Sequence, residues 1–276
     1  MNEKYDLSGK SALITGAAGL LGGQHAIAIL QHGGTVVLTD VNQAELKKKA
    51  QILSEEFGKN NVFFFLMDVT SEDSINNVLE KLTLAGIHIS ILINNAAIDP
   101  KVGPKETLSE SSRLENFSVE QWNKELAVGL TGTFLCSKIF GTAMATSENS
   151  GVILNISSDL SIISPDQRLY AKNGLEPHFQ PVKPITYCAI KSGITGLTRY
   201  LATYWSDNNV RCNSLSPGGV ENGQGQDFTN NLITRIPMGR MAHVDEYQAA
   251  VQFLCSDASQ YMNGQNIVMD GGRSVW

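Results

Sequence analysis

The sequence predicts an α/β fold, a single Rossmann-like doubly wound parallel sheet flanked by helices on both faces. Three observations predict it. Short, nearly all-apolar runs alternate with longer amphipathic stretches along the whole chain. A Gly-rich turn follows the first apolar run and opens the first helical stretch. The composition, 42% hydrophobic and 17% charged residues, suits a substantial core. Because neither a repeat nor a linker interrupts the alternation, residues 1–276 are expected to form one domain.

Each apolar run is short enough for a strand that helices cover on both sides. The expected strands are Ser11–Ile14, Thr35–Thr39, Val62–Met67, Ile89–Ile93, Val152–Ile156, Val210–Leu215 and Gln265–Met269. The stretches between them have helical length and spacing, and the clearest are Leu20–Gln31, Gln43–Phe57, Ser71–Leu84, Val119–Thr146 and Tyr187–Trp205.

Two segments break the alternation. Residues 99–118 contain Pro100, Gly103 and Pro104 beside a Ser/Glu-rich patch, and residues 159–184 contain four prolines and a glycine. Proline and glycine interrupt regular elements, so both segments are predicted to be long loops. Each follows a strand of the parallel sheet and therefore emerges at its carboxyl edge, where such folds bind ligands.

The charge and the residue spacing argue against several functions. A net charge of -6 disfavours a nucleic-acid partner, because binding a phosphate backbone relies on clustered Lys and Arg. The four cysteines show no CxxC spacing and the five histidines form no metal-binding pattern, so buried thiols and no metal site are expected. The N-terminus has no apolar signal region, and no segment has about 20 uninterrupted apolar residues. A cytoplasmic protein without a membrane partner is predicted.

The Gly-rich turn, with Gly16, Gly19 and Gly22, predicts a dinucleotide site. Glycines allow a pyrophosphate to approach the backbone and rest on the positive end of the following helix. Asp40 ends the second strand, where a carboxylate accepts hydrogen bonds from both hydroxyls of the adenosine ribose and repels a 2′-phosphate. No Lys or Arg stands just after Asp40, so NAD is favoured over NADP. The alternative is that Asp40 serves only as a helix N-cap.

Beyond the Gly-rich turn, motifs in order along the chain resemble those of the short-chain dehydrogenase/reductase family. They are Asp68-Val69, Asn94-Asn95-Ala96-Ala97, Asn155-Ile156-Ser157-Ser158, Tyr187-Cys188-Ala189-Ile190-Lys191, Ser216-Pro217-Gly218-Gly219-Val220, Ile236-Pro237-Met238-Gly239-Arg240 and Asp270-Gly271-Gly272. The resemblance implies cofactor contacts at Gly16, Gly19, Leu20, Leu21, Gly22, Asp40, Asp68, Val69, Asn95, Tyr187, Lys191, Pro217, Gly218, Val220 and Asn222. It also implies a homo-oligomer, expected to be a tetramer, that pairs through the two long helices.

The predicted chemistry is hydride transfer between a secondary alcohol and a ketone. Tyr187 needs its phenolate stabilised to act near neutral pH, and Lys191 lies one helical turn away on the same face. The resemblance makes Ser158 the residue that holds the substrate oxygen, and the side chain of Ser157 is expected on the opposite face of the strand. Tyr170 is closer to the family's usual spacing from the serine, but Gly174 stands where its lysine would be.

The chain departs from the family pattern at Gly129, where the catalytic Asn usually stands. We consider two explanations equally: a water fills the space and completes the proton path past Lys191, or close packing by the 99–118 loop or a ligand requires a glycine. Weak catalysis by an NAD-binding sensor is the corresponding alternative function.

The substrate is expected to be polar. The segment after Pro217-Gly218 is rich in amides and acids, which suits a sugar-like molecule, and similar enzymes occur in bacterial surface-sugar and flagellin-glycan pathways. A 3-oxoacyl or aliphatic alcohol substrate is the alternative. The same polar residues could instead only keep exposed loops soluble.

Overall fold

The structure, a computed structural model, describes residues 3–98, 112–147 and 151–276. Its centre is a parallel sheet of seven strands in the order β3-β2-β1-β4-β5-β6-β7. The strands are β1 (Ser11–Thr15), β2 (Thr35–Asp40), β3 (Val62–Leu66), β4 (Ile91–Asn94), β5 (Gly151–Ile156), β6 (Val210–Pro217) and β7 (Asn266–Met269). The order turns back between β1 and β4, as a doubly wound sheet requires. The predicted fold class is confirmed.

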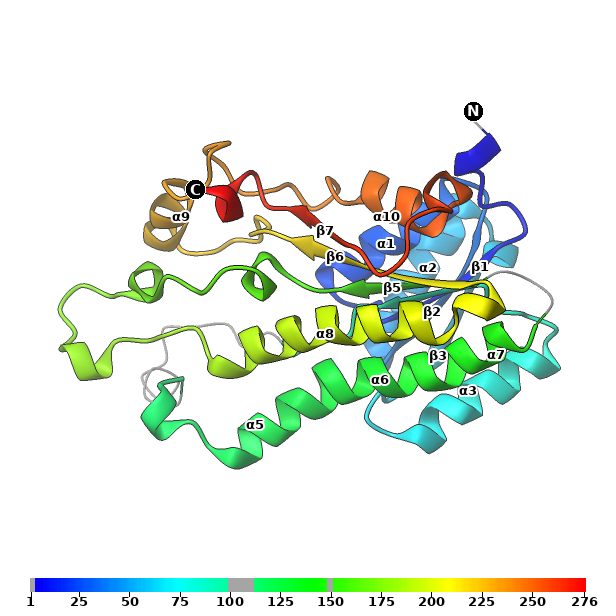
Figure 1. Cartoon of the computed structure of the whole chain (residues 1–276), viewed down its shortest axis with the longest axis horizontal. Coiled ribbons are helices and arrows are strands. Elements are labelled where there is room, and N and C mark those ends of the chain that lie inside the picture. The colour runs from blue at the N-terminus through cyan, green and yellow to red at the C-terminus, as the bar shows by residue number, and fades with distance from the viewer. Residues whose placement is uncertain (1–2, 99–111, 148–150) are drawn as a thin grey trace.

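Helices cover both faces of the sheet (Figure 1). The α-helices of the described residues are α1 (Leu20–Leu30), α2 (Gln43–Phe57), α3 (Glu72–Leu84), α5 (Val119–Leu126), α6 (Gly132–Cys136), α7 (Thr142–Ala145), α8 (Ile185–Tyr204), α9 (Gln226–Ile233) and α10 (Gln248–Cys255). Helices α1, α2 and α10 pack on one face, and α3, α8 and the run from α5 to α7 pack on the other. Successive strand residues point to opposite faces of the sheet and so pack into two separate cores. Ile14, for example, belongs to the core under α1, α2 and α10, and Leu13 belongs to the core on the other face.

Three of the helix starts are set by side chains that accept a backbone N–H. Asn42 caps α2, Ser71 caps α3 and Ser118 caps α5, each accepting the N–H three residues on. Helix α8 begins at Ile185, two residues before the predicted start at Tyr187, and Thr186 lies inside its first turn. The Thr186 hydroxyl donates to the buried carboxylate of Glu125.

The helix from Val119 to Ala145 is continuous and contains two π-helical turns, Ala127–Thr131 and Ser137–Gly141. It is long and apolar enough to cross a membrane by length and composition, but half of its most apolar window is buried inside the fold. A core helix that packs on a sheet has the same properties.

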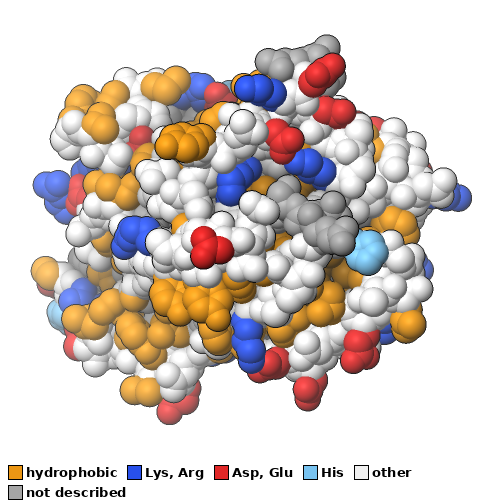
Figure 2. Space-filling model, turned by 45° about the vertical axis from the view of Figure 1, so that its right-hand side comes forward, with side chains coloured by type: hydrophobic (Ala, Val, Ile, Leu, Met, Phe, Trp, Pro, Cys, Tyr) orange, Lys and Arg blue, Asp and Glu red, His pale blue; other side chains and the backbone are white. Residues whose placement is uncertain are grey.

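The two predicted loops differ in how far they are described. Within 159–184 the chain forms three short 3₁₀ helices, Asp159–Ser161, Gln167–Tyr170 and Pro177–Phe179, and is therefore more ordered than predicted. Of 99–118, residues 99–111 lie outside the described residues, and Leu114–Asn116 forms one 3₁₀ turn. On the face shown in Figure 2, basic and acidic side chains are interspersed.

Candidate active site

The Gly-rich turn is shaped by two glycines that no other residue replaces without strain. Gly16 has a φ of +63°, and a Cβ there would lie 2.8 Å from the Cα of Ala96. A Cβ on Gly22 would lie 2.4 Å from the carbonyl oxygen of Gly16. The Asn95 amide donates to the carbonyls of Thr15 (3.0 Å) and Gly16 (3.1 Å) and braces the turn against the end of β4. The start of α1 has no side-chain cap, so its first N–H groups fit a pyrophosphate.

Asp40 lies beside this turn at the end of β2. Its carboxylate accepts the backbone N–H of Ala18 at 3.1 Å and that of Asn42 at 2.9 Å. The alternative that Asp40 serves only as a helix cap is wrong, because the N-cap of α2 is Asn42. The carboxylate is fixed next to the residues that would hold the phosphates.

The remaining predicted cofactor residues lie at or beyond the same strand ends. Asp68 accepts the N–H and hydroxyl of Thr70, and Val69 is buried. The N–H of Gly218 donates to Met269 at 2.9 Å, and a Cβ on Gly218 would lie 2.7 Å from the Cα of Asp270. Val220 forms a bridge with Ala242 beyond β6, while Asn222 is exposed.

Ser158, Tyr187 and Lys191 come from the end of β5 and the first two turns of α8, which pack together. The Lys191 side chain is 5% exposed and donates to the carbonyl of Ile156 at 2.8 Å. Its Nζ lies 5.7 Å from the centre of the Tyr187 ring. Ser157 faces away and donates to the Lys191 carbonyl, while Ser158 is buried at the strand end. The ammonium is therefore held near the Tyr187 ring, at the end of β5 that carries Ser158.

Gly129 lies in the first π-helical turn and is buried against α8. A Cβ there would lie 2.7 Å from Cγ2 and 3.2 Å from Cδ1 of Ile190. Ile190 occupies the place that a Cβ would take, which favours close packing over a water as the reason for the glycine. Among the described residues the packing partner is therefore Ile190 of α8, and residues 99–111 of the predicted loop lie outside the described residues.

The comparisons with known proteins agree with this geometry. The family model described as enoyl-(acyl carrier protein) reductase matches residues 16–274. The D-threitol dehydrogenase of Mycolicibacterium smegmatis is 30% identical, over 98% of this chain and 95% of its own length. The chain belongs to the short-chain dehydrogenase/reductase family. It is accordingly an oxidoreductase of a family that acts on CH–OH groups and binds a nicotinamide cofactor.

Two solved structures show which cofactors such chains bind. A short-chain dehydrogenase from Leptospira borgpetersenii with bound NAD+ has 29% identity and a TM-score of 0.84, covering 100% of this chain and 96% of that one. A gluconate 5-dehydrogenase from Burkholderia cenocepacia in complex with NADP and tartrate has 25% identity and a TM-score of 0.84, covering 99% and 98%.

In this short-chain dehydrogenase/reductase, the 159–184 segment packs against α9. Leu169 and Leu232 belong to a small apolar cluster separate from the two sheet cores. Tyr170 packs its ring on Phe228 with centroids 5.5 Å apart, so it is a packing residue of this cluster. Asp166 bridges the segments through Arg235 at 2.7 Å. Hydrogen bonds from the Arg168 and Arg235 guanidinium groups hold the pKa of the Asp166 carboxyl well below its usual value.

Sequence reasoning gave no site role to three charged residues. Lys183 places its Nζ 3.8 Å from the centre of the Tyr187 ring. Asp159 and Arg273 form an ion pair of 2.7 Å whose side chains are only 4% and 10% exposed. An acidic residue directly after the predicted serine, in a segment that leaves a buried strand, was the available signal for Asp159. Nothing in the sequence indicated the arginine, because the pair spans nearly half the chain.

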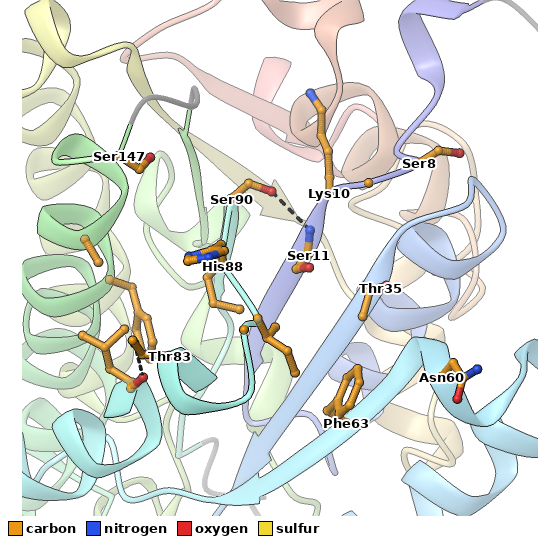
Figure 3. A pocket seen from close by; sticks show the side chains of 17 residues that line it. Ser8, Lys10, Ser11, Thr35, Asn60, Phe63, Thr83, His88, Ser90 and Ser147 are labelled. Carbon is orange, nitrogen blue, oxygen red and sulfur yellow. Dashed lines mark hydrogen bonds between the residues drawn. The ribbon is translucent and has the colours of Figure 1, made fainter. Parts of the chain in front are cut away.

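A hollow of about 650 Å³ lies at the opposite edge of the sheet (Figure 3). Ser11 and Thr35, the first residues of β1 and β2, line it with Lys10, His88 and Ser90. It is therefore separated from Ser158 by the length of the strands, and we do not assign the chemistry to it.

Proposed function

We propose that this chain is an NAD(H)-dependent dehydrogenase that interconverts a secondary alcohol and a ketone on a polar, sugar-like substrate. The observation that carries the proposal is the buried Lys191 ammonium, which is held by the end of β5 beside the Tyr187 ring. This arrangement adjoins the strand end that carries Ser158, and the Gly-rich turn lies at the same edge of the sheet.

Each residue has a distinct role in the proposed reaction. Tyr187 takes the proton from the substrate hydroxyl during oxidation and returns it during reduction. Lys191 stabilises the phenolate, and its bond to Ile156 keeps the ammonium in place. Ser158 donates a hydrogen bond to the substrate oxygen, on which negative charge develops. The nicotinamide supplies the hydride acceptor or donor when bound.

Asp40 supports the preference for NAD. A carboxylate already fixed by the N–H groups of Ala18 and Asn42 cannot turn away from a 2′-phosphate without losing those bonds. Its remaining lone pairs suit the two hydroxyls of a ribose.

A polar substrate is supported by the segment after β6 and by two of the relatives. Residues 221–227 are exposed and consist of amides, acids and glycines. Threitol and gluconate dehydrogenases are among the similar proteins. A 3-oxoacyl or aliphatic substrate is the second candidate, and the description of the matching family model favours it.

Steady-state turnover of the purified protein tests these proposals. We expect oxidation of one or more polyols, aldonates or sugars with NAD+, and slower rates with NADP+ at equal concentration. Faster reduction of a 3-oxoacyl thioester than oxidation of any polyol would favour the second candidate. NADH binding without turnover of any alcohol or ketone would instead indicate a sensor.

We propose that the protein assembles as a homotetramer and that it is located in the cytoplasm. Apolar and aromatic side chains are exposed along the two long helices, including Phe134, Tyr200 and Tyr204, and a second copy of the chain would cover them. Light scattering at micromolar concentration should show a species of about four chain masses. A single species of 29.9 kDa would refute the assembly.

A further inference from the structure

The hydroxyl of Ser158 is held by its neighbour in the chain. Its Oγ donates to Oδ1 of Asp159 at 2.9 Å and accepts the N–H of Leu160 at 3.2 Å. Asp159 is 3% exposed and begins the 3₁₀ turn that follows β5. A group proposed to donate to the substrate oxygen therefore already has a carboxylate competing for its only hydrogen.

The other oxygen of this carboxylate receives Arg273 from the C-terminal end of the chain. The Arg273 guanidinium donates to Oδ2 of Asp159 at 2.7 Å. The turn that presents it requires glycine, because Gly271 and Gly272 have φ values of +67° and +89°. The Asp270 carboxylate fixes the turn by accepting the N–H groups of Gly272 (2.9 Å) and Ser274 (2.7 Å).

A buried ion pair at this place calls for a reason other than stability. Desolvation of two charges offsets most of their attraction, and apolar replacements of such pairs are often as stable. An unpaired carboxylate beside Ser158 would hold the hydroxyl strongly and would repel the negative charge that develops on the substrate oxygen. Arg273 neutralises that carboxylate, which weakens both effects.

We propose that Asp159 and Arg273 are positioning residues for Ser158: Asp159 orients the serine hydroxyl, and Arg273 neutralises Asp159 so that the hydroxyl can be shared with the substrate oxygen. The inference rests on the proposed role of Ser158 in alcohol and ketone turnover. It makes the C-terminal 3₁₀ turn (Arg273–Val275) a support of the active site.

The test compares four variants of the full-length protein with the wild type: Arg273→Gln, Asp159→Asn, the double variant and Arg273→Lys. Arg240→Gln is the matched control, because Arg240 also forms a pair with a carboxylate, Glu246, at 2.6 Å, but at the surface. The measurements are the melting temperature, the Kd for NADH, and kcat and KM with the best substrate of the wild type.

We expect Arg273→Gln to lower kcat by about 100-fold, the order of magnitude that loss of one donor to a developing oxyanion costs. Arg273→Lys should stay within about 5-fold of the wild type because it keeps the charge. Asp159→Asn should lose less than Arg273→Gln, because it leaves an acceptor for the hydroxyl and no anion. The double variant should recover most of the kcat that Arg273→Gln loses, with NADH binding and the control unchanged throughout.

A purely structural pair would give another pattern. Both single variants would then lose melting temperature and kcat in parallel, or the double variant would be no better than Arg273→Gln, and either result would overturn the proposal. If a single variant fails to fold, the double variant and Arg273→Lys still decide, because an inactive double variant with normal NADH binding contradicts the proposal. A wild type that turns over no alcohol or ketone would refute the proposed function itself, and this inference with it.

Discussion

Replacing His25 should remove an acid-dependent loss of stability. His25 lies on α1 and is fully buried, and neither ring nitrogen has a hydrogen-bond partner within the described residues. Burial lowers the pKa of His25 from 6.5 to about 4, and the nearby Asn95 side chain opposes this shift only in part. The folded protein therefore keeps the ring neutral, while the unfolded chain takes up a proton as the pH falls below about 6.5.

The size of the effect follows from these two pKa values. The stability lost through protonation of the unfolded chain at His25 is negligible well above pH 6.5, reaches about 2 kcal/mol at pH 5, and levels off below pH 4 at about 3 kcal/mol. In His25→Leu this contribution disappears, so its free energy of unfolding should fall less steeply between pH 7 and pH 5 than that of the wild type. The loss of two unpaired buried nitrogens also offsets part of any packing cost.

Urea unfolding at fixed protein concentration, measured at pH 8, 7, 6 and 5, gives the comparison. The difference between wild type and His25→Leu should change by about 2 kcal/mol from pH 8 to pH 5. His88→Gln, which removes an exposed imidazole, should keep the slope of the wild type. Parallel curves for wild type and His25→Leu would refute the reasoning and would mean that the buried ring finds a partner when protonated.

Three further predictions concern the proposed site. Replacing Asp40 with Ala should raise kcat/KM with NADP+ relative to NAD+, and an unchanged ratio would show that Asp40 does not exclude the 2′-phosphate. Tyr187→Phe should abolish nearly all turnover, while its Kd for NADH stays close to that of the wild type. Tyr170→Phe should mainly lower the melting temperature. If Tyr170→Phe lost more turnover than Tyr187→Phe, the chemistry would have to lie in the 159–184 segment. Gly129→Ala should destabilise the fold by about 1–3 kcal/mol, although alanine is the better helix former. Ile190→Ala should lessen that cost in a double-mutant cycle, and additive costs of the two substitutions would contradict the packing explanation.

The sequence was sufficient for the sheet, because each strand is an apolar run bounded by turn residues. The ends of the strands were predicted less accurately, because hydrogen bonding to the neighbouring strand decides where a strand stops. Strand β4 begins at Ile91 and not at Ile89, and β6 continues beyond Leu215 to Pro217. Helix α8 begins two residues before the predicted Tyr187, and the Thr186 hydroxyl in its first turn donates to Glu125, which is remote in sequence.

In the candidate site, too, local features could be predicted from the sequence and contacts between distant segments could not. Local spacing brought Tyr187 and Lys191 together, and the motif order placed Ser158 at a strand end. The packing of Ile190 against Gly129 and the pairing of Asp159 with Arg273 depend on contacts between distant segments. No periodicity in one sequence encodes such contacts.

The small apolar cluster between the 159–184 segment and α9 has a consequence for how this end of the molecule tolerates sequence change. Leu169 and Phe228 pack in a unit with its own interior, apart from the side chains that hold the sheet together. A substitution on one side of this cluster must be accommodated by the other, while the layers around the sheet are undisturbed. Paired changes in these two segments can thus be accommodated locally, without a change in the packing of either sheet core.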